Sequence, residues 1–196
     1  MSLQMESINR FDLVHDCQQV FRLLLTALSN PGSWHSYASQ AAKFDQHGLW
    51  LPLALTLCDL ETKFRVVCCA TELCREIIFL SNAQQTSMEA ADFIFCGKGS
   101  DPQQILPQVR SGSFADPHKS ATVFVLATSA GNSEQLLSGP GIPEEGLQTV
   151  IPEEAVQWLD MRDALNYEYP LGVDIFIVHP QAKLMGLPRT TRRGRS

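Results

Sequence analysis

The first segment with a clear pattern of apolar positions spans residues 12–29. Its apolar residues return every three or four positions, as on one face of a helix: Val14, Cys17, Phe21, Leu24, Leu25 and Leu28. Asp12 can serve as the N-cap, and Asn30-Pro31-Gly32 predicts the end of the helix. Residues 48–58 are more continuously apolar and predict a buried helix that holds Pro52 in its first turn.

The middle of the chain alternates between strand and helix patterns. Residues 64–70 are rich in β-branched and apolar side chains and predict a buried strand, after which Thr71 can cap a helix through about residue 80. Residues 92–96 predict a second strand. Asp101 and Pro102 then suit the N-cap and first position of another helix.

The last third of the chain adds hairpin patterns. Residues 121–127 carry the strongest strand pattern, and together with a weaker one at 134–137 they suggest a hairpin. Pro152 opens an amphipathic helix through about residue 165. Residues 173–178 and 183–187 flank a short turn, as in an antiparallel pair. These patterns together predict a layered α/β domain with a mixed sheet.

Length and composition favour a single domain. A chain of 196 residues that is 44% hydrophobic can bury roughly 70% of its unfolded surface. No apolar run approaches the roughly 20 residues that cross a bilayer, and the first ten residues lack the pattern of a secretory signal. We therefore expect a cytoplasmic protein with no membrane partner. The six cysteines lie mostly within apolar runs, and in a cytoplasmic chain we expect them to be reduced core thiols. No CxxC pair or spaced His cluster indicates a zinc site.

Positive charge is concentrated at the C-terminus. Residues 189–196 hold four arginines and no acid, so removing their charge from the net −6 leaves −10 for residues 1–188. We divide the chain accordingly into one α/β domain, 1–188, and a basic tail, 189–196. The acidic body disfavours nucleic acid. The tail either grips phosphates or an acidic partner or, as is more usual for such segments, is solvated.

Three segments contain more Gly, Pro, Ser, Thr and Arg than their elements need. The first, residues 138–142, holds Ser138, Gly139 and Gly141; it can form an anion-binding nest, although a plain tight turn is the more common role. The second, residues 186–191, offers Arg189, Thr190 and Thr191 as donors to a phosphate or carboxylate. Arg189 can equally form an ion pair that anchors the chain end.

The third segment is the end of the first helix. Arg22 and Ser29 are seven residues apart and so lie on one face, where they can touch one ligand, although a helix stop is the simpler interpretation. The common dinucleotide, nucleotide, hydrolase and zinc-protease motifs are absent from the sequence. No catalytic group or metal site is predicted.

Five blocks in order resemble the H-subunit family of the bacterial carbon-phosphorus lyase system. They are DCQQVFRLLLTALSNPG at 16–32, SGSFADPHKSATVFV at 111–125, LSGPGI at 137–142, YPLGVDIF at 169–176 and LPRTT at 187–191. Together they cover most of the chain. The fourth block also contains Asp174, which joins the candidate ligand or interface residues.

The resemblance implies a three-layer α/β/α fold with a mixed sheet, similar to the large domain of pyridoxal-phosphate transferases but without the cofactor site. No cofactor is therefore expected. It also implies a homodimeric subunit that joins the G, I and J subunits, with a functional link to the L subunit. This complex supports formation of ribose 1-phosphonate 5-triphosphate from ATP and an alkylphosphonate.

Two roles remain open within that resemblance. In the first, the chain is a non-catalytic subunit whose glycine-rich and arginine-containing segments shape interfaces. In the second, Gly139, Gly141 and Arg189–Thr191 bind the nucleotide triphosphate or the phosphonate directly.

Overall fold

A computed structural model describes residues 11–128, 133–166 and 168–194. Two of the expectations concern residues outside these ranges. They are the absence of a secretory signal in residues 1–10 and Arg195 of the predicted basic tail. The described helices are α2 (His15–Ser29), α3 (Ala38–Ala41), α4 (Leu51–Leu57), α5 (Thr71–Ser81), α6 (Pro102–Ile105) and α7 (Glu153–Leu165), with short 3-10 turns η1 (Met88–Ala90), η2 (Leu106–Gln108) and η3 (Pro117–Lys119). The strands are β1 (Trp34–Ser36), β2 (Lys63–Val67), β3 (Gln84–Gln85), β4 (Phe93–Cys96), β5 (Thr122–Leu126), β6 (Ser133–Ser138), β7 (Leu147–Ile151), β8 (Asp174–His179), β9 (Lys183–Leu187) and β10 (Arg192–Arg193).

The larger of two sheets has seven strands in the order β1-β9-β8-β5-β4-β2-β3. Strands β3, β2, β4, β5 and β8 run parallel, whereas β9 is antiparallel to β8 and β1 is antiparallel to β9. The expected α/β class and mixed sheet are thus confirmed. The likeness to pyridoxal-phosphate transferases stays a prediction.

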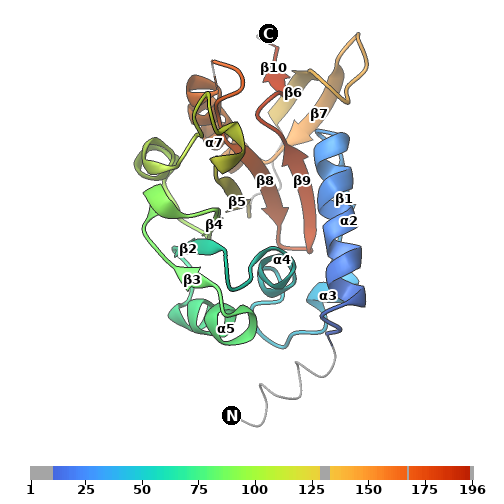
Figure 1. The fold of residues 1–196 in the computed structure, drawn as a ribbon. Coiled ribbons are helices and arrows are strands. Elements are labelled where there is room, and N and C mark those ends of the chain that lie inside the picture. The colour runs from blue at the N-terminus through green and yellow to red at the C-terminus, as the bar shows by residue number, and fades with distance from the viewer. Residues whose placement is uncertain (1–10, 129–132, 167, 195–196) are drawn as a thin grey trace.

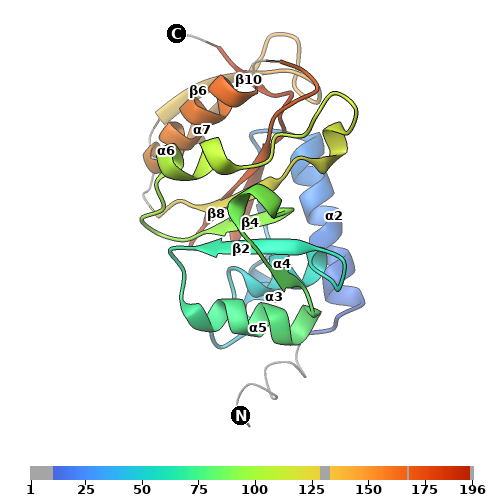
Figure 2. The same cartoon turned by 60° about the vertical axis from the view of Figure 1, so that its left-hand side comes forward.

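Helices cover both faces of this sheet. Figures 1 and 2 show α4 and α5 on one side of the central strands and α6 and α7 on the other. Each face has its own apolar core, since successive residues of a buried strand point to opposite faces. Phe95, Phe124 and Phe176 lie in register on β4, β5 and β8 and stack with ring centroids 5.2 and 4.9 Å apart. This stack forms the centre of one core.

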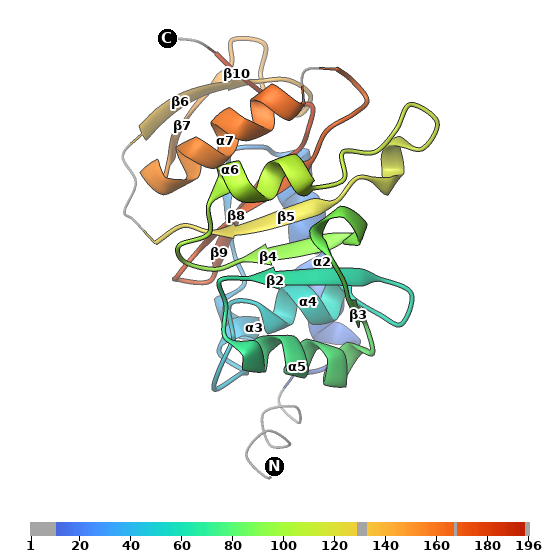
Figure 3. The same cartoon turned by 90° about the vertical axis from the view of Figure 1, so that its left-hand side faces the viewer.

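The smaller sheet has three strands in the order β10-β6-β7. One face carries Leu137 and Ile151 into the core that includes Trp158 and Leu159 of α7. Figure 3 shows α7 running across β6 and β7. The other face leaves Leu136 and Val150 exposed. This arrangement corrects the predicted hairpin of residues 121–127 with 134–137, because β5 pairs with β4 and β8 while β6 pairs with β7.

The residues predicted to cap the helix N-termini were partly confirmed. Asp101 is the N-cap of α6, and its carboxylate accepts a hydrogen bond from the Gln103 N–H. The N-cap position of α2 is Val14, but the carboxylate of Asp12, two residues earlier, accepts hydrogen bonds from the backbone N–H groups of Val14 and His15. Thr71 is not a cap: it is the first residue of α5, and Ala70 precedes it without a side-chain hydrogen bond. The antiparallel pair β8–β9 is confirmed.

The apolar face predicted for α2 was wrong in part. Its buried residues are Asp16, Val20, Leu24 and Ala27, whereas Val14, Phe21 and Leu25 are exposed. A salt bridge from Lys43 to Asp16, 2.5 Å long, explains how a carboxylate occupies the inner face.

All six cysteines are free thiols. Burial raises the pKa of Cys58 to about 12, consistent with a core thiol. Cys68 departs from the expectation, because it is exposed in a left-handed conformation with φ +51° directly after β2. Among the described residues, no helix combines the length and hydrophobicity that a bilayer crossing requires.

Candidate functional site

Two of the candidate segments meet the end of α2 in what we call the glycine junction, formed by residues 29–32, 138–142 and 190–191. A Cβ atom built on Gly141 would lie 2.3 Å from the backbone oxygen of Ser29, and one on Gly139 would lie 2.8 Å from that of Thr190. The Thr149 hydroxyl of β7 donates to the Gly32 oxygen over 2.9 Å. Three segments that are distant in sequence are therefore in close backbone contact.

Gly139 and Gly141 lie in a tight turn. They have φ values of +131° and +81°, which a residue with a side chain adopts only with strain. The Ile142 N–H donates to the Gly139 oxygen over 3.1 Å and closes the turn. At each glycine, the space that a side chain would need is taken by a backbone oxygen of another segment. The segment is thus a closely packed turn, and its use as an anion-binding nest stays a prediction.

Ser29 and Ser138 belong to the junction, and Arg22 lies two helical turns before Ser29. The Ser29 hydroxyl donates to the Leu25 oxygen, one helical turn back, over 2.8 Å. Ser138 pairs with Arg192 in the β6–β10 ladder. Arg22 is exposed on α2. The structure thus joins the segments without joining all of their polar side chains.

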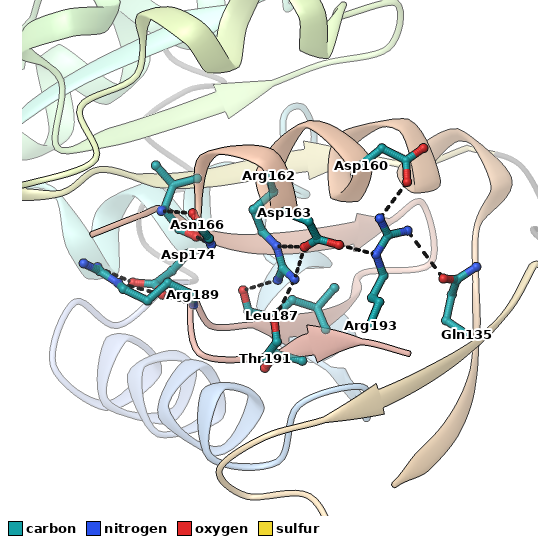
Figure 4. A network of polar contacts seen from close by, with 11 residues as sticks. Gln135, Asp160, Arg162, Asp163, Asn166, Asp174, Leu187, Arg189, Thr191 and Arg193 are labelled. Atoms are coloured by element: carbon teal, nitrogen blue, oxygen red, sulfur yellow. Dashed lines mark hydrogen bonds and ion pairs between the residues drawn. The ribbon is translucent and has the colours of Figure 1, made fainter. Parts of the chain in front are cut away.

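Arg189 and Asp174 form a second centre next to the junction, shown at the left of Figure 4. One Nη of Arg189 donates to the Asp174 carboxylate over 2.7 Å and to the Ser120 hydroxyl. The other donates to the backbone oxygens of Pro117 and Pro170 over 2.9 and 3.4 Å, and Nε lies 3.4 Å from Asp174. Each of the five guanidinium N–H groups can therefore be assigned a partner within the chain.

These bonds give Arg189 a clear structural role. Asp174 begins β8, Pro117 and Ser120 precede β5, and Pro170 precedes β8. Arg189 hence ties together three of the five sequence blocks, at 111–125, 169–176 and 187–191. These contacts agree with the interpretation in which Arg189 anchors the chain end. The charge of its guanidinium, the group best suited to an external anion, is paired with the Asp174 carboxylate.

A buried arginine that the sequence analysis missed lies beside this centre. Arg162 of α7 has no exposed surface, and it donates to the backbone oxygens of Leu187 and Thr191 over 3.2 and 2.9 Å. It also contacts the Asp163 carboxylate at 2.7 Å. Burial lowers the pKa of Arg162, and the charge of Asp163 opposes that shift. Arg162 thereby fixes the residues that follow β9.

Asp163 is shared with Arg193 of β10 (Figure 4). Arg193 Nε lies 2.6 Å from one Asp163 oxygen, and an Nη lies 2.6 Å from Asp160. Burial opposes protonation of Arg193, but the hydrogen bonds to Asp160 and Asp163 outweigh it, and the pKa is raised. Residues 189–194, separated in the sequence analysis as a basic tail, thus contact the body of the domain through Arg189, Thr191 and Arg193.

The helical spacing of residues in α7 could have predicted that Arg162 is buried. The buried residues of α7 are Ala155, Trp158, Leu159 and Arg162, at positions i, i+3, i+4 and i+7. An arginine on the inner stripe of a helix needs buried acceptors, because a buried charge without partners is costly. The backbone oxygens of Leu187, at the end of β9, and of Thr191, before β10, supply them.

A separate surface feature is the outer side of α2. Val14, Phe21 and Leu25 are 72%, 47% and 49% exposed, and their spacing of seven and four residues places them in one row. Arg22 lies beside the row. We call this set the α2 row.

Comparison with known proteins supports the family resemblance found in the sequence. The model of the family described as bacterial phosphonate metabolism protein (PhnH) matches residues 10–193. A protein of Stutzerimonas stutzeri described as a C-P lyase subunit protein, HtxG, is 32% identical over 179 residues, which cover 89% of this chain and 84% of the relative. With the five blocks, the glycine junction and the Arg189 centre all inside the matched region, this chain belongs to the PhnH family of bacterial phosphonate metabolism proteins.

Proposed function

We propose that the chain is a non-catalytic, homodimeric subunit of a carbon-phosphorus lyase complex. In that role it supports formation of ribose 1-phosphonate 5-triphosphate from ATP and an alkylphosphonate, together with G, I, J and L subunits. Membership of the PhnH family and the description of the S. stutzeri relative support the pathway and the complex. The fold similarity to pyridoxal-phosphate transferases, without the cofactor, belongs to the same proposal.

The observation that carries the subunit role is the α2 row. Apolar side chains that are about half exposed or more, aligned along a 15-residue helix, lower the free energy when another apolar surface covers them. An antiparallel pairing of two α2 helices about a two-fold axis would bring Phe21 and Leu25 of each copy together. In such a two-fold contact, both copies use the same surface patch, so no second complementary surface is needed.

The bonding of Arg189 supports the non-catalytic part of the proposal. Its guanidinium is bound by Asp174, Ser120 and two backbone oxygens. Binding a phosphate there would require the loss of several of these contacts. The positive charge of Arg189 therefore stabilises contacts within the chain and is not offered to a ligand.

Substitution of Phe21 tests the subunit role. Phe21→Glu places a charge in the middle of the α2 row, and we expect the dimer to dissociate because an unpaired charge is costly in an apolar contact. Molar mass by sedimentation velocity gives the result, and co-purification with the G, I and J subunits extends it. Phe79→Glu is the matched control, since Phe79 is 77% exposed on α5, away from the row. A monomeric parent protein, or equal dissociation in both variants, would refute the placement.

A second candidate function, direct binding of the nucleotide triphosphate or phosphonate, is favoured by one observation. The Thr191 hydroxyl is buried, and it has no hydrogen-bond partner. It lies in the glycine junction, where Thr191 Cα would be 3.4 Å from a Cβ on Gly139. A ligand that donates to or accepts from this hydroxyl would satisfy it.

Calorimetry of the isolated dimer with ATP or methylphosphonate separates the two functions. Heat of binding at micromolar ligand that disappears in Thr191→Val, with an unchanged unfolding midpoint, would establish the second function. No binding of either compound supports the first. Addition of pyridoxal phosphate, followed by absorbance and borohydride reduction, tests the expectation that no aldimine forms with a lysine.

A further inference from the structure

The chain crosses from the large sheet to the small one in its last described residues. β9 ends at Leu187 in the seven-stranded sheet, and β10 at Arg192–Arg193 pairs with β6 of the three-stranded sheet. Figure 4 shows this segment below α7, with Arg162 and Arg193 contacting Asp163 from two sides. The two halves of the segment are held by different kinds of contact.

The inner half, residues 187–191, is fixed by buried groups. Arg162 binds the backbone oxygens of Leu187 and Thr191, and Arg189 is bound to Asp174. Thr191 is 3% exposed. Detaching this half would leave the buried Arg162 guanidinium without its two backbone acceptors, which is costly in a protein interior.

In the outer half, residues 192–194, Arg192 and Gly194 are exposed, and Arg193 is partly buried. This half forms a two-residue ladder, Arg192 with Ser138 and Arg193 with Leu137, extended by a 2.7 Å hydrogen bond from the Gly194 N–H to the Leu136 oxygen. Its ion pairs run from Arg193, whose side chain is 13% exposed, to Asp160 and Asp163, whose side chains are 62% and 32% exposed. The pair with the solvated Asp160 carboxylate is weak, and salt screens it.

We propose that β10 is an ionic latch. Residues 192–194 detach from β6 and reattach while both sheets and the inner half stay in place. The ion pairs of Arg193 with Asp160 and Asp163 set the balance between the closed and open forms. Local opening of a short terminal strand costs far less than global unfolding, because few buried contacts are lost.

Opening of the latch changes the chemistry of one sheet edge. The backbone groups of Leu136 and Ser138 that β10 covers become available along β6. An uncovered strand edge accepts a strand from another chain through main-chain hydrogen bonds. The closed latch therefore protects β6 from strand addition. This inference is independent of the proposed subunit role, because it rests on contacts within one chain.

Amide hydrogen exchange of the full chain, followed residue by residue by NMR, tests the latch. Arg193→Gln removes both ion pairs, and we expect exchange at residues 192–194 to become about threefold to tenfold faster. Arg192→Gln is the matched control, because Arg192 is the exposed neighbour with the same charge. Asp160→Asn should act in the same direction as Arg193→Gln with a smaller effect, since it removes one pair of the two.

Salt gives a second readout that a purely structural role would not produce. Raising ionic strength to about 1 M, where the screening length is about 3 Å, should speed exchange at 192–194 in the parent chain and leave Arg193→Gln unchanged. Exchange at β8 and α7 should stay constant in both. Equal effects of the Arg192 and Arg193 substitutions, salt-insensitive exchange in the parent, or faster exchange throughout α7 and β8 would overturn the proposal.

Discussion

The two sheets of this protein are stabilised by different interactions. In the seven-stranded sheet, the central strands are buried on both faces, and the aromatic stack of Phe95, Phe124 and Phe176 joins three of them. The three-stranded sheet buries one face against α7 and exposes the other. It also contacts the glycine junction and the arginines that flank the last strand. Apolar burial is thus the main contact of the central strands in the first sheet, whereas the second adds specific polar and backbone contacts.

The largest expected effect on stability comes from a substitution that creates a cavity beside the large sheet. Phe124→Ala removes a fully buried ring that stacks on two others, and we expect a loss of about 4 kcal/mol in the free energy of unfolding. Urea unfolding followed by circular dichroism measures it. Val150→Ala on the exposed face of the small sheet should change stability by less than about 0.5 kcal/mol. Similar losses in the two variants would remove the distinction between the sheets.

A smaller but still large loss should follow from removal of the buried arginine. Arg162→Gln leaves the backbone oxygens of Leu187 and Thr191 without their charged donor, at a cost of about 3 kcal/mol. The same urea titration gives the value, and Arg192→Gln, which changes an exposed arginine, serves as control. If Arg162→Gln were as stable as that control, the small sheet would not depend on the arginine contacts.

The third prediction separates backbone strain from steric contact in the glycine junction. Gly141 and Gly99 have nearly equal φ values of +81° and +84°, but a Cβ on Gly99 would meet nothing within 4 Å. Gly99→Ala should therefore cost only the conformational strain, about 1 kcal/mol, and Gly141→Ala about 2 kcal/mol because of the added contact with Ser29. Thermal unfolding of both variants, compared with the parent, gives the difference. Equal costs would show that the junction can relax.

Sequence patterns predicted the inner strands of the large sheet well, but missed its edge strands β1 and β3 and predicted the small sheet poorly, for the same physical reason. Strands β4, β5, β8 and β9 appear as apolar runs because neighbouring layers bury them. β7 was missed since Ile151 is its one buried residue, and a half-exposed strand with polar residues resembles a loop. β6 was recognised as a strand but paired with the wrong partner, because pairing depends on the path of the chain as well as on local pattern.

The candidate site was predictable to a similar degree. The order of blocks pointed to Asp174, Arg189 and Gly139, and the structure brings these segments together at two adjacent centres. Arg162 was missed, although its place on the inner stripe of α7 was readable, because a charged residue is normally assigned to the solvent side. The exposed α2 row was taken for a core face, since periodicity identifies an apolar side without identifying what covers it.

The sequence by itself determined the α/β class, most of the helices, the buried strands and the family, because these depend on local periodicity and on blocks of residues in a given order. Only the tertiary structure decided what the polar groups do. Arg189 is a brace because Asp174, Ser120 and Pro117 arrive beside it from other segments, and the basic C-terminal residues are anchored because Arg162 and Asp163 lie under them. The energy of a charged side chain depends on the groups around it, and those groups are set by the folded path of the chain.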